Sequence, residues 1–363
     1  MRKSTSRIVG ILAVGSFVVA TPSTAQREYV SPETMTAEAL YGLSCAACHG
    51  ADGSGLHPDN PLYTSFDSPP ADLSDPLFNS REPAADWAIV IKYGGAKIGL
   101  SSQMPAFGEA MTDPQIDELV TYIKSLADTE RFPPGDLNFV RAVDTIKAFP
   151  EDEALIINRY VDSDEGSDSF RSTLYYGRRF GARHQGEVKL AHINRDGVSE
   201  LDEAEIGWKW AIRHDLAARS LFSLGLEAAF PIADDDASEE IIPYFSFAKG
   251  LSDDFTLQTS VKALLPVDHF DDGEAKVSAI LHWMRSPWPR SMTPALEATI
   301  SAPWSDADID ATLIPQLYFG LSKLGHVALA LGIEIPLTDL DYDYRIHSFL
   351  LWDVADGMFW DGW

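Results

Sequence analysis

The stretch KLGHVALALGIEIPL, residues 323–337, alternates large apolar side chains with small or polar ones at every second position. The apolar phase contains Val327, Leu329, Leu331, Ile333 and Ile335, and the other phase contains His326, Ala328, Ala330, Gly332 and Glu334. A period of two is that of a β-strand, whose successive side chains point to opposite faces. The stretch therefore predicts a strand with one apolar and one mixed face.

Similar stretches recur from Glu153 to the C-terminus, and most have the length of a membrane strand, about 9–11 residues. The twelve predicted strands are 153–161, 171–180, 186–193, 204–212, 220–230, 241–249, 255–265, 275–285, 294–302, 311–320, 325–337 and 344–354. An even number of antiparallel strands is what a closed membrane barrel requires. Residues 153–363 are therefore predicted to form an antiparallel β-barrel. A β-sandwich, whose strands also alternate, is the alternative fold.

The connections between these strands differ in charge on the two sides. The six that follow odd-numbered strands carry a formal charge of −22 together, whereas those that follow even-numbered strands sum to +2 and are mostly short. Outer-membrane barrels have short periplasmic turns and longer outer loops, so this asymmetry favours such a barrel over a soluble sandwich. Three cations in the apolar phase, Arg178, Lys249 and Arg285, stand at the presumed periplasmic rim, where they cost little.

Polar residues in the opposite phase are then expected to line an interior. They are Glu187, Lys189, Glu205, Lys209, Glu227, Lys262, Glu297 and Glu334.

Composition excludes several classes of protein. The chain of 363 residues has 55 Asp and Glu against 28 Lys and Arg, a formal charge of −27. An acidic balance argues against a nucleic-acid binder, which needs a basic face for phosphates. Two cysteines exclude a disulfide-dense scaffold, and no apolar run is long enough for a membrane-spanning helix.

The N-terminus has the pattern of a signal peptide. Basic residues precede an apolar run over residues 8–20, and Ser23-Thr24-Ala25 offers small residues for cleavage. Residues 1–25 are therefore predicted to be removed on export, so the mature chain is expected outside the cytoplasm. Its first domain is expected to span residues 26–130.

Both cysteines belong to one motif, Cys45-Ala46-Ala47-Cys48-His49. The pattern C-x-x-C-H is typical of c-type haem attachment, in which two thiols bind the haem vinyl groups and the histidine is the proximal iron ligand. Thioredoxin-like pairs and half zinc sites share the two cysteines but not the adjacent histidine. The motif therefore predicts one covalently attached haem c.

A sixth iron ligand is expected on a later loop. Met104 lies in the segment QMPAFG, which precedes an N-cap at Thr112 and an amphipathic helix. Helices are also expected over 36–44 and 83–93. Met111 is a rival ligand, and His57 is a second rival that would give bis-histidine ligation.

Residues 33–127 resemble the class I cytochrome c family through CAACHGADGSG, QMPAFG and the closing amphipathic helix. The resemblance implies thioether attachment at Cys45 and Cys48, His49 as the proximal ligand and Met104 as the distal ligand. Residues 56–81 depart from the shortest members of the family and are expected to form an insertion over the haem edge.

The sequence thus predicts a small all-α cytochrome c fold, a linker over 131–152 and a barrel that resembles outer-membrane channels in general. The expected function is one-electron transfer with periplasmic redox proteins, by a haem domain anchored in the outer membrane through a barrel that can also act as a pore. A soluble periplasmic carrier with a β-sandwich docking domain is the alternative. A haem enzyme or sensor is another, if Met104 does not bind iron.

Overall fold

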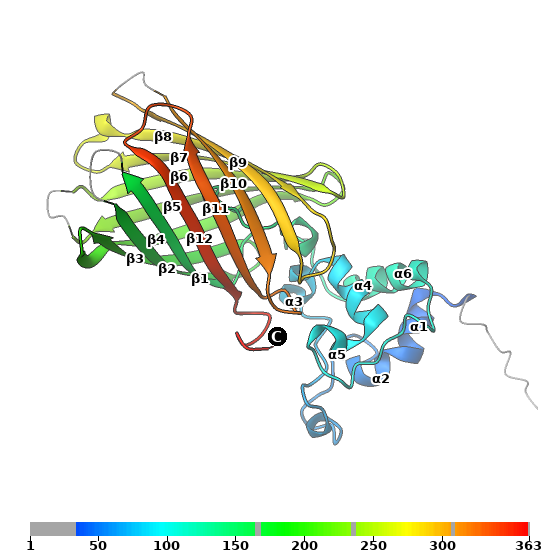
Figure 1. Cartoon of the computed structure of the whole chain (residues 1–363). Helices are drawn as coiled ribbons and strands as arrows, with labels where there is room; N and C mark the ends of the chain where they lie inside the picture. The colour runs from blue at the N-terminus through cyan, green and yellow to red at the C-terminus, as the bar shows by residue number, and fades with distance from the viewer. Residues whose placement is uncertain (1–33, 164–167, 234–236, 306–308, 362–363) are drawn as a thin grey trace, which may run out of the picture.

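The computed structural model describes residues 34–163, 168–233, 237–305 and 309–361. The predicted signal peptide, residues 1–25, lies outside these ranges. The described chain forms a cluster of short helices that lies against one end of a long barrel (Figure 1). The predicted fold class, a small helical part followed by an antiparallel barrel of twelve strands, is confirmed.

The helical part contains six α-helices and two 3-10 turns within the described residues. They are α1 (Ala37–Ser44), α2 (Ala46–His49), η2 (Tyr63–Ser65), α3 (Pro76–Arg81), α4 (Ala84–Tyr93), α5 (Gly95–Ile98), α6 (Asp113–Lys124) and η3 (Gly135–Leu137). None of the described helices is long and apolar enough to cross a membrane.

Local signals explain where the longer helices begin. The Thr36 side chain accepts a hydrogen bond from the Ala39 amide and caps α1. A capping box of Thr112 and Gln115 starts α6, with Pro114 in its first turn. The apolar stripe of α6 packs with α1 and α4 into one core, whose buried members include Leu40, Tyr41, Trp87, Ile91, Ile116, Leu119, Val120 and Ile123.

The barrel is a closed ring in which each strand pairs antiparallel with its neighbours in the chain, and β1 pairs with β12. The strands are β1 (Glu153–Ser163), β2 (Ser169–Phe180), β3 (His184–Arg195), β4 (Val198–Asp215), β5 (Ser220–Pro231), β6 (Glu240–Gly250), β7 (Phe255–Pro266), β8 (Glu274–Trp283), β9 (Met292–Pro303), β10 (Asp310–Gly320), β11 (Val327–Pro336) and β12 (Tyr342–Asp353). A 3-10 turn, η4 (Phe270–Asp272), lies between β7 and β8. Closure excludes the two packed sheets of a sandwich.

The period of two seen in the sequence is the inside–outside alternation of the wall. On β11, Ala328 and Ala330 are fully buried, whereas Leu331 and Ile333 are 45% and 50% exposed on the outer surface. The apolar phase therefore faces outward on this barrel, and the small or polar phase faces the lumen.

The connections after even-numbered strands lie at the end that carries the helices, and the odd-numbered strands end at the far end (Figure 1). The prediction was too short for β4. This strand begins at Val198 and pairs with β3 through a bulge at Ala191/His192, so most of the acidic loop expected over 194–203 is strand.

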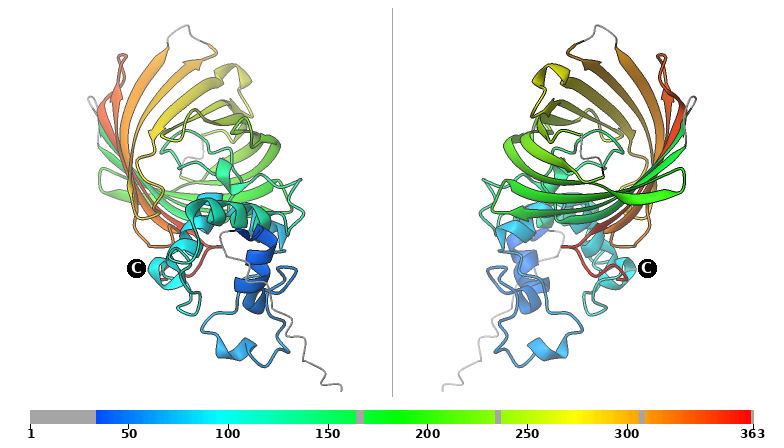
Figure 2. Two further views of the ribbon diagram at one scale, coloured as in Figure 1. Left: turned by 90° about the vertical axis from the view of Figure 1, so that its right-hand side faces the viewer. Right: turned by 90° about the vertical axis from the view of Figure 1, so that its left-hand side faces the viewer.

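The segment predicted to link the two parts also fills part of the barrel. Leu137, Phe139, Ala148 and Phe149 pack on lumen-facing residues of β4, β5 and β6. The views along the barrel in Figure 2 show this segment inside the ring of strands. Residues 137–151, called the plug here, therefore connect the helices to β1 by passing through the lumen.

Polar contacts hold the plug in place. The Asp144 carboxylate lies 2.8 Å from Lys276 Nζ and accepts hydrogen bonds from Ser278 and Thr299 on the next strand. The Gln258 side chain donates to the Val140 carbonyl at 2.6 Å. These partners come from β7, β8 and β9, the strands that adjoin the β4–β6 wall contacted by the apolar residues of the plug.

The polar residues expected in the interior do face it. Lys189 illustrates the arrangement: its ammonium lies 2.8 Å from Glu205, 3.0 Å from Glu227 and 3.9 Å from Glu187. A buried cation of this kind requires such partners, because a lumen wall gives it little water.

Candidate functional site

The two cysteines and His49 lie on one short helical turn. Cys45 ends α1, and Cys48 and His49 follow within α2, so that Cys45 and Cys48 are three residues apart on a helical surface. Both thiols are free. Burial raises the pKa of Cys45 to about 11, which keeps this thiol protonated until it reacts.

The ring of His49 is fixed by the insertion predicted over residues 56–81. Its Nδ1 lies 3.1 Å from the carbonyl oxygen of Ala71. This contact places the proton on Nδ1 and leaves Nε2 free to bind a metal. Burial also lowers the pKa of His49, which favours the neutral imidazole that a metal needs.

Met104 is held by close backbone packing after α5. The amide of Gly95 donates to the Met104 carbonyl at 3.0 Å. A Cβ on Gly95 would meet the carbonyl oxygen of Ser101 and the side chain of Met104, so this approach requires glycine. The sequence QMPAFG thus positions one methionine against α4 and α5.

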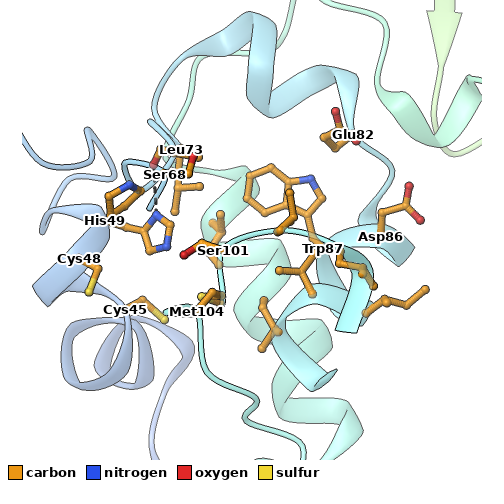
Figure 3. A pocket seen from close by; sticks show the side chains of 18 of the residues that line it. Cys45, Cys48, His49, Ser68, Leu73, Glu82, Asp86, Trp87, Ser101 and Met104 are labelled. Atoms are coloured by element: carbon orange, nitrogen blue, oxygen red, sulfur yellow. Dashed lines mark hydrogen bonds between the residues drawn. The ribbon is translucent and has the colours of Figure 1, made fainter. Parts of the chain in front are cut away.

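All four predicted residues, Cys45, Cys48, His49 and Met104, line one cavity of about 340 Å³ (Figure 3). Apolar side chains of α4 and of the 66–73 segment supply most of its remaining wall. The two rival ligands lie elsewhere: Met111 is 7% exposed within the helical core, and the His57 side chain is 77% exposed beside Asp59.

One further observation indicates that the cavity suits a haem. Trp87 lines it, and the indole Nε1 of this residue is buried without a hydrogen-bond partner. A buried unpaired donor is costly, so it calls for an acceptor, and a haem propionate is one. Arg81, a positively charged hydrogen-bond donor, lines the same cavity.

The barrel supplies part of the cavity wall, which the sequence did not indicate. Pro289 and Leu324, from two turns between strands, and Ala355 and Asp356, after β12, lie beside the haem-site residues. The Arg81 Nε lies 3.0 Å from an Asp356 carboxylate oxygen. These residues meet only because the chain folds back at its C-terminus.

A second contact joins the same two parts. The rings of Tyr93, at the end of α4, and Trp288, between β8 and β9, have centroids 5.0 Å apart. Within the cavity wall, burial raises the pKa of Asp86 to about 7, with Glu82 and Asp136 adding repulsion. The cavity is therefore fixed against the barrel and has an acidic edge.

Comparison with known proteins supports the helical part. Residues 35–127 match the family model for cytochrome c, which confirms the resemblance drawn from the motifs. No curated protein has a detectable sequence match to the chain.

The barrel is similar in structure to several outer-membrane proteins. The NanC porin has 8% sequence identity and a TM-score of 0.42, with 55% of this chain and 98% of that chain covered. An outer membrane channel from Pseudomonas putida F1 has 10% identity and a TM-score of 0.44, with 59% and 99% covered. Outer membrane phospholipase A from Escherichia coli has 10% identity and a TM-score of 0.35, with 56% and 96% covered.

These structural likenesses are too remote to assign an activity to the barrel. The motif, the cavity and the family match agree for the helical part. Residues 35–127 are therefore a cytochrome c domain, joined in this chain to a closed barrel of twelve strands.

Proposed function

We propose that the chain is a mono-haem c-type electron carrier, whose cytochrome domain is anchored at the periplasmic mouth of an outer-membrane barrel. The observation that carries this proposal is the convergence of Cys45, Cys48, His49 and Met104 on one cavity beside the unpaired Trp87 indole. Haem c, when bound there, supplies one-electron chemistry between Fe(II) and Fe(III).

Each residue of the site has a distinct part. Cys45 and Cys48 would hold the group through thioethers, and His49 would bind its iron through Nε2, the nitrogen that Ala71 leaves free. Met104 completes the ligand set, and a thioether ligand raises the reduction potential relative to a second histidine. With His49 and Met104 both binding it, the iron would favour electron transfer over substrate chemistry.

The outer surface of the barrel supports a membrane location. Large apolar side chains are exposed on the outer face of each strand. Examples are Leu174 at 57%, Ile206 at 55% and Ile300 at 51%. Exposure of this extent is far beyond the patches of ordinary soluble proteins. An apolar outer band above a polar lumen is the pattern of an outer-membrane barrel.

Residues at the rim agree with this placement. Trp208, Trp210 and Trp283 are outward-facing aromatics towards the end that carries the helices. Arg178 and Lys249 stand near the last positions of β2 and β6 at this same end, where cations are tolerated. The haem domain would then lie on the periplasmic side.

The partners proposed are periplasmic redox proteins. The barrel turns and the C-terminal segment cover one side of the cavity, so a partner must approach from another. Ser68 and Leu100 line the cavity and are exposed, which makes their side the open approach.

The ligand set is tested by the absorption spectrum of the purified holoprotein. The oxidised protein should show the near-infrared band of methionine–iron ligation, and Met104→Ala should abolish it, whereas Met111→Leu should retain it. A band that survives in Met104→Ala, or a high-spin spectrum in the unchanged protein, would contradict the proposed carrier. Membrane anchoring is tested separately, because release by osmotic shock without detergent would refute it.

A further inference from the structure

A row of polar side chains crosses four adjacent strands at mid-height of the barrel. Ser348 on β12 is the register partner of Asn158 on β1. Asn158 is in turn the partner of Ser172 on β2, and Ser172 is the partner of His192 on β3. The four residues, called the polar row here, therefore lie side by side on one rung of the wall.

The polar row points away from the lumen. The residues two positions away on each strand have the same orientation, and they are exposed: Ile346 is 43% exposed, Ile156 43%, Leu174 57% and Leu190 39%. Positions between them, such as Ala191 and His347, are buried inside. On the side of the helices the next outward rung is wholly apolar, with Ile156, Leu174 and Leu190. On the far side the next rung mixes apolar Ile346 and Phe170 with Tyr160 and Asn194.

This position is unusual for the barrel. At the middle outward positions of the other described strands the side chains are apolar, with the single exception of Thr259 on β7. Four polar residues on neighbouring strands at one level are therefore a localised feature of the surface.

Hydrogen bonding within the row is incomplete. Ser172 Oγ donates to Asn158 Oδ1 at 2.9 Å, and Asn158 Nδ2 donates weakly to Ser348 Oγ at 3.4 Å. One amide hydrogen of Asn158 remains available, and His192 makes no hydrogen bond to the described residues. Hydrocarbon tails offer no partner for such groups, so the row is costly where it faces lipid.

We propose that the polar row is the interface between two copies of this chain in the membrane. The inference rests on the proposed membrane location of the barrel. A two-fold axis along the membrane normal, passing between Asn158 and Ser172, would place Asn158 of one copy opposite Ser172 of the second copy. Both side chains donate and accept hydrogen bonds, so the row is complementary to itself.

The apolar surroundings suit the same contact. Ile156 and Leu174 lie beside the centre of the row, and Ile156 of one copy would pack against Leu174 of the second copy, which shields the polar groups from lipid. Polar side chains at such contacts stabilise association in membranes because the alternative is an unsatisfied group. A barrel wall is convex, so the contact is centred on β1 and β2.

Cross-linking of the full-length holoprotein in native membranes tests the geometry. Cys45 and Cys48 are joined to haem in that form, so an added thiol is the only free one among the described residues. Ile156→Cys should form a disulfide-linked dimer on oxidation, whereas Leu226→Cys, 48% exposed on β5 against 43% for Ile156, should not. Equal cross-linking at both positions, or none at Ile156→Cys, would overturn the proposal.

Association in detergent micelles tests the role of the polar groups. Asn158→Leu should raise the dimer dissociation constant about tenfold, while Thr259→Leu, which removes the isolated outward hydroxyl, should leave it unchanged. An unchanged haem spectrum shows that each variant is folded. A protein that stays monomeric at all concentrations refutes the inference. If that monomer also releases fatty acid from phospholipid in a reaction that depends on Ser172, the polar row would be assigned to ester hydrolysis instead.

These outcomes are separable from a failure of the proposed function. Extraction of the chain without detergent would refute the proposed membrane location. A chain that needs detergent for extraction but does not associate would refute only the proposed dimer.

Discussion

Removal of the Asp144 carboxylate should weaken the attachment of the plug to the lumen wall. In the structure this carboxylate pairs with Lys276 at 2.8 Å and accepts hydrogen bonds from Ser278 at 2.8 Å and Thr299 at 3.1 Å. Asp144→Ala leaves the Lys276 ammonium without its partner. Breaking a fully buried pair costs about 3–5 kcal/mol. Because the Asp144 side chain is 21% exposed, we expect a smaller loss, about 2 kcal/mol.

Limited proteolysis measures this loss directly. The plug contains two trypsin sites, Arg141 and Lys147, whose side chains are 13% and 7% exposed and paired with Glu153 and Glu151. When opening is faster than cleavage, the rate follows the population of the open state. A loss of 2 kcal/mol raises that population about 30-fold.

The assay follows the barrel fragments that begin at Ala142 or Ala148. They should appear about 30-fold faster in Asp144→Ala than in the unchanged chain, and cleavage after the exposed Arg131 provides an internal reference. Adding Lys276→Met removes the unpaired ammonium and should restore part of the protection. Equal cleavage rates in the unchanged chain and Asp144→Ala would refute the anchoring role of this carboxylate.

Three further perturbations follow from the same contacts. The reduction potential should fall as the pH rises through about 7, because ionised Asp86 stabilises the oxidised iron. The slope should be at most about 59 mV per pH unit, and Asp86→Asn should flatten it in a potentiometric titration. Gly135→Ala should lower the melting temperature followed by circular dichroism, since a Cβ there meets the Arg81 carbonyl, whereas Gly42→Ala, in open space, should not. Lys189→Met leaves three carboxylates without their cation and should lower the urea midpoint of the barrel by the equivalent of about 3–5 kcal/mol; an unchanged midpoint would show that the cluster is not needed.

The local features of both parts were predictable because each depends on neighbours in the chain. The capping box at Thr112 and the apolar stripe of α6 are specified within a few residues. The alternation along β11 likewise reports one buried and one outward face. Even the choice between sandwich and barrel was accessible, since loop charge differs between the two ends.

Long-range contacts were not predictable in this way. The plug was expected to be a linker, because residues 131–152 are rich in breaks and carry no strong period. Its partners lie far away in the sequence: Asp144 and Glu297 are 153 residues apart, and Arg81 and Ala355 are 274 apart. No local pattern specifies which lumen residues such a segment will meet.

The sequence by itself determined the haem motif, the methionine loop, the number of strands and the side of the barrel that is acidic. These follow from spacing, periodicity and charge, which act over a few residues. The tertiary structure alone decided that the plug occupies the lumen, that the barrel closes one side of the haem cavity, and that four polar residues form one outward row. Each of these depends on strand register and on closure of β1 against β12, and only the folded ring brings those residues together.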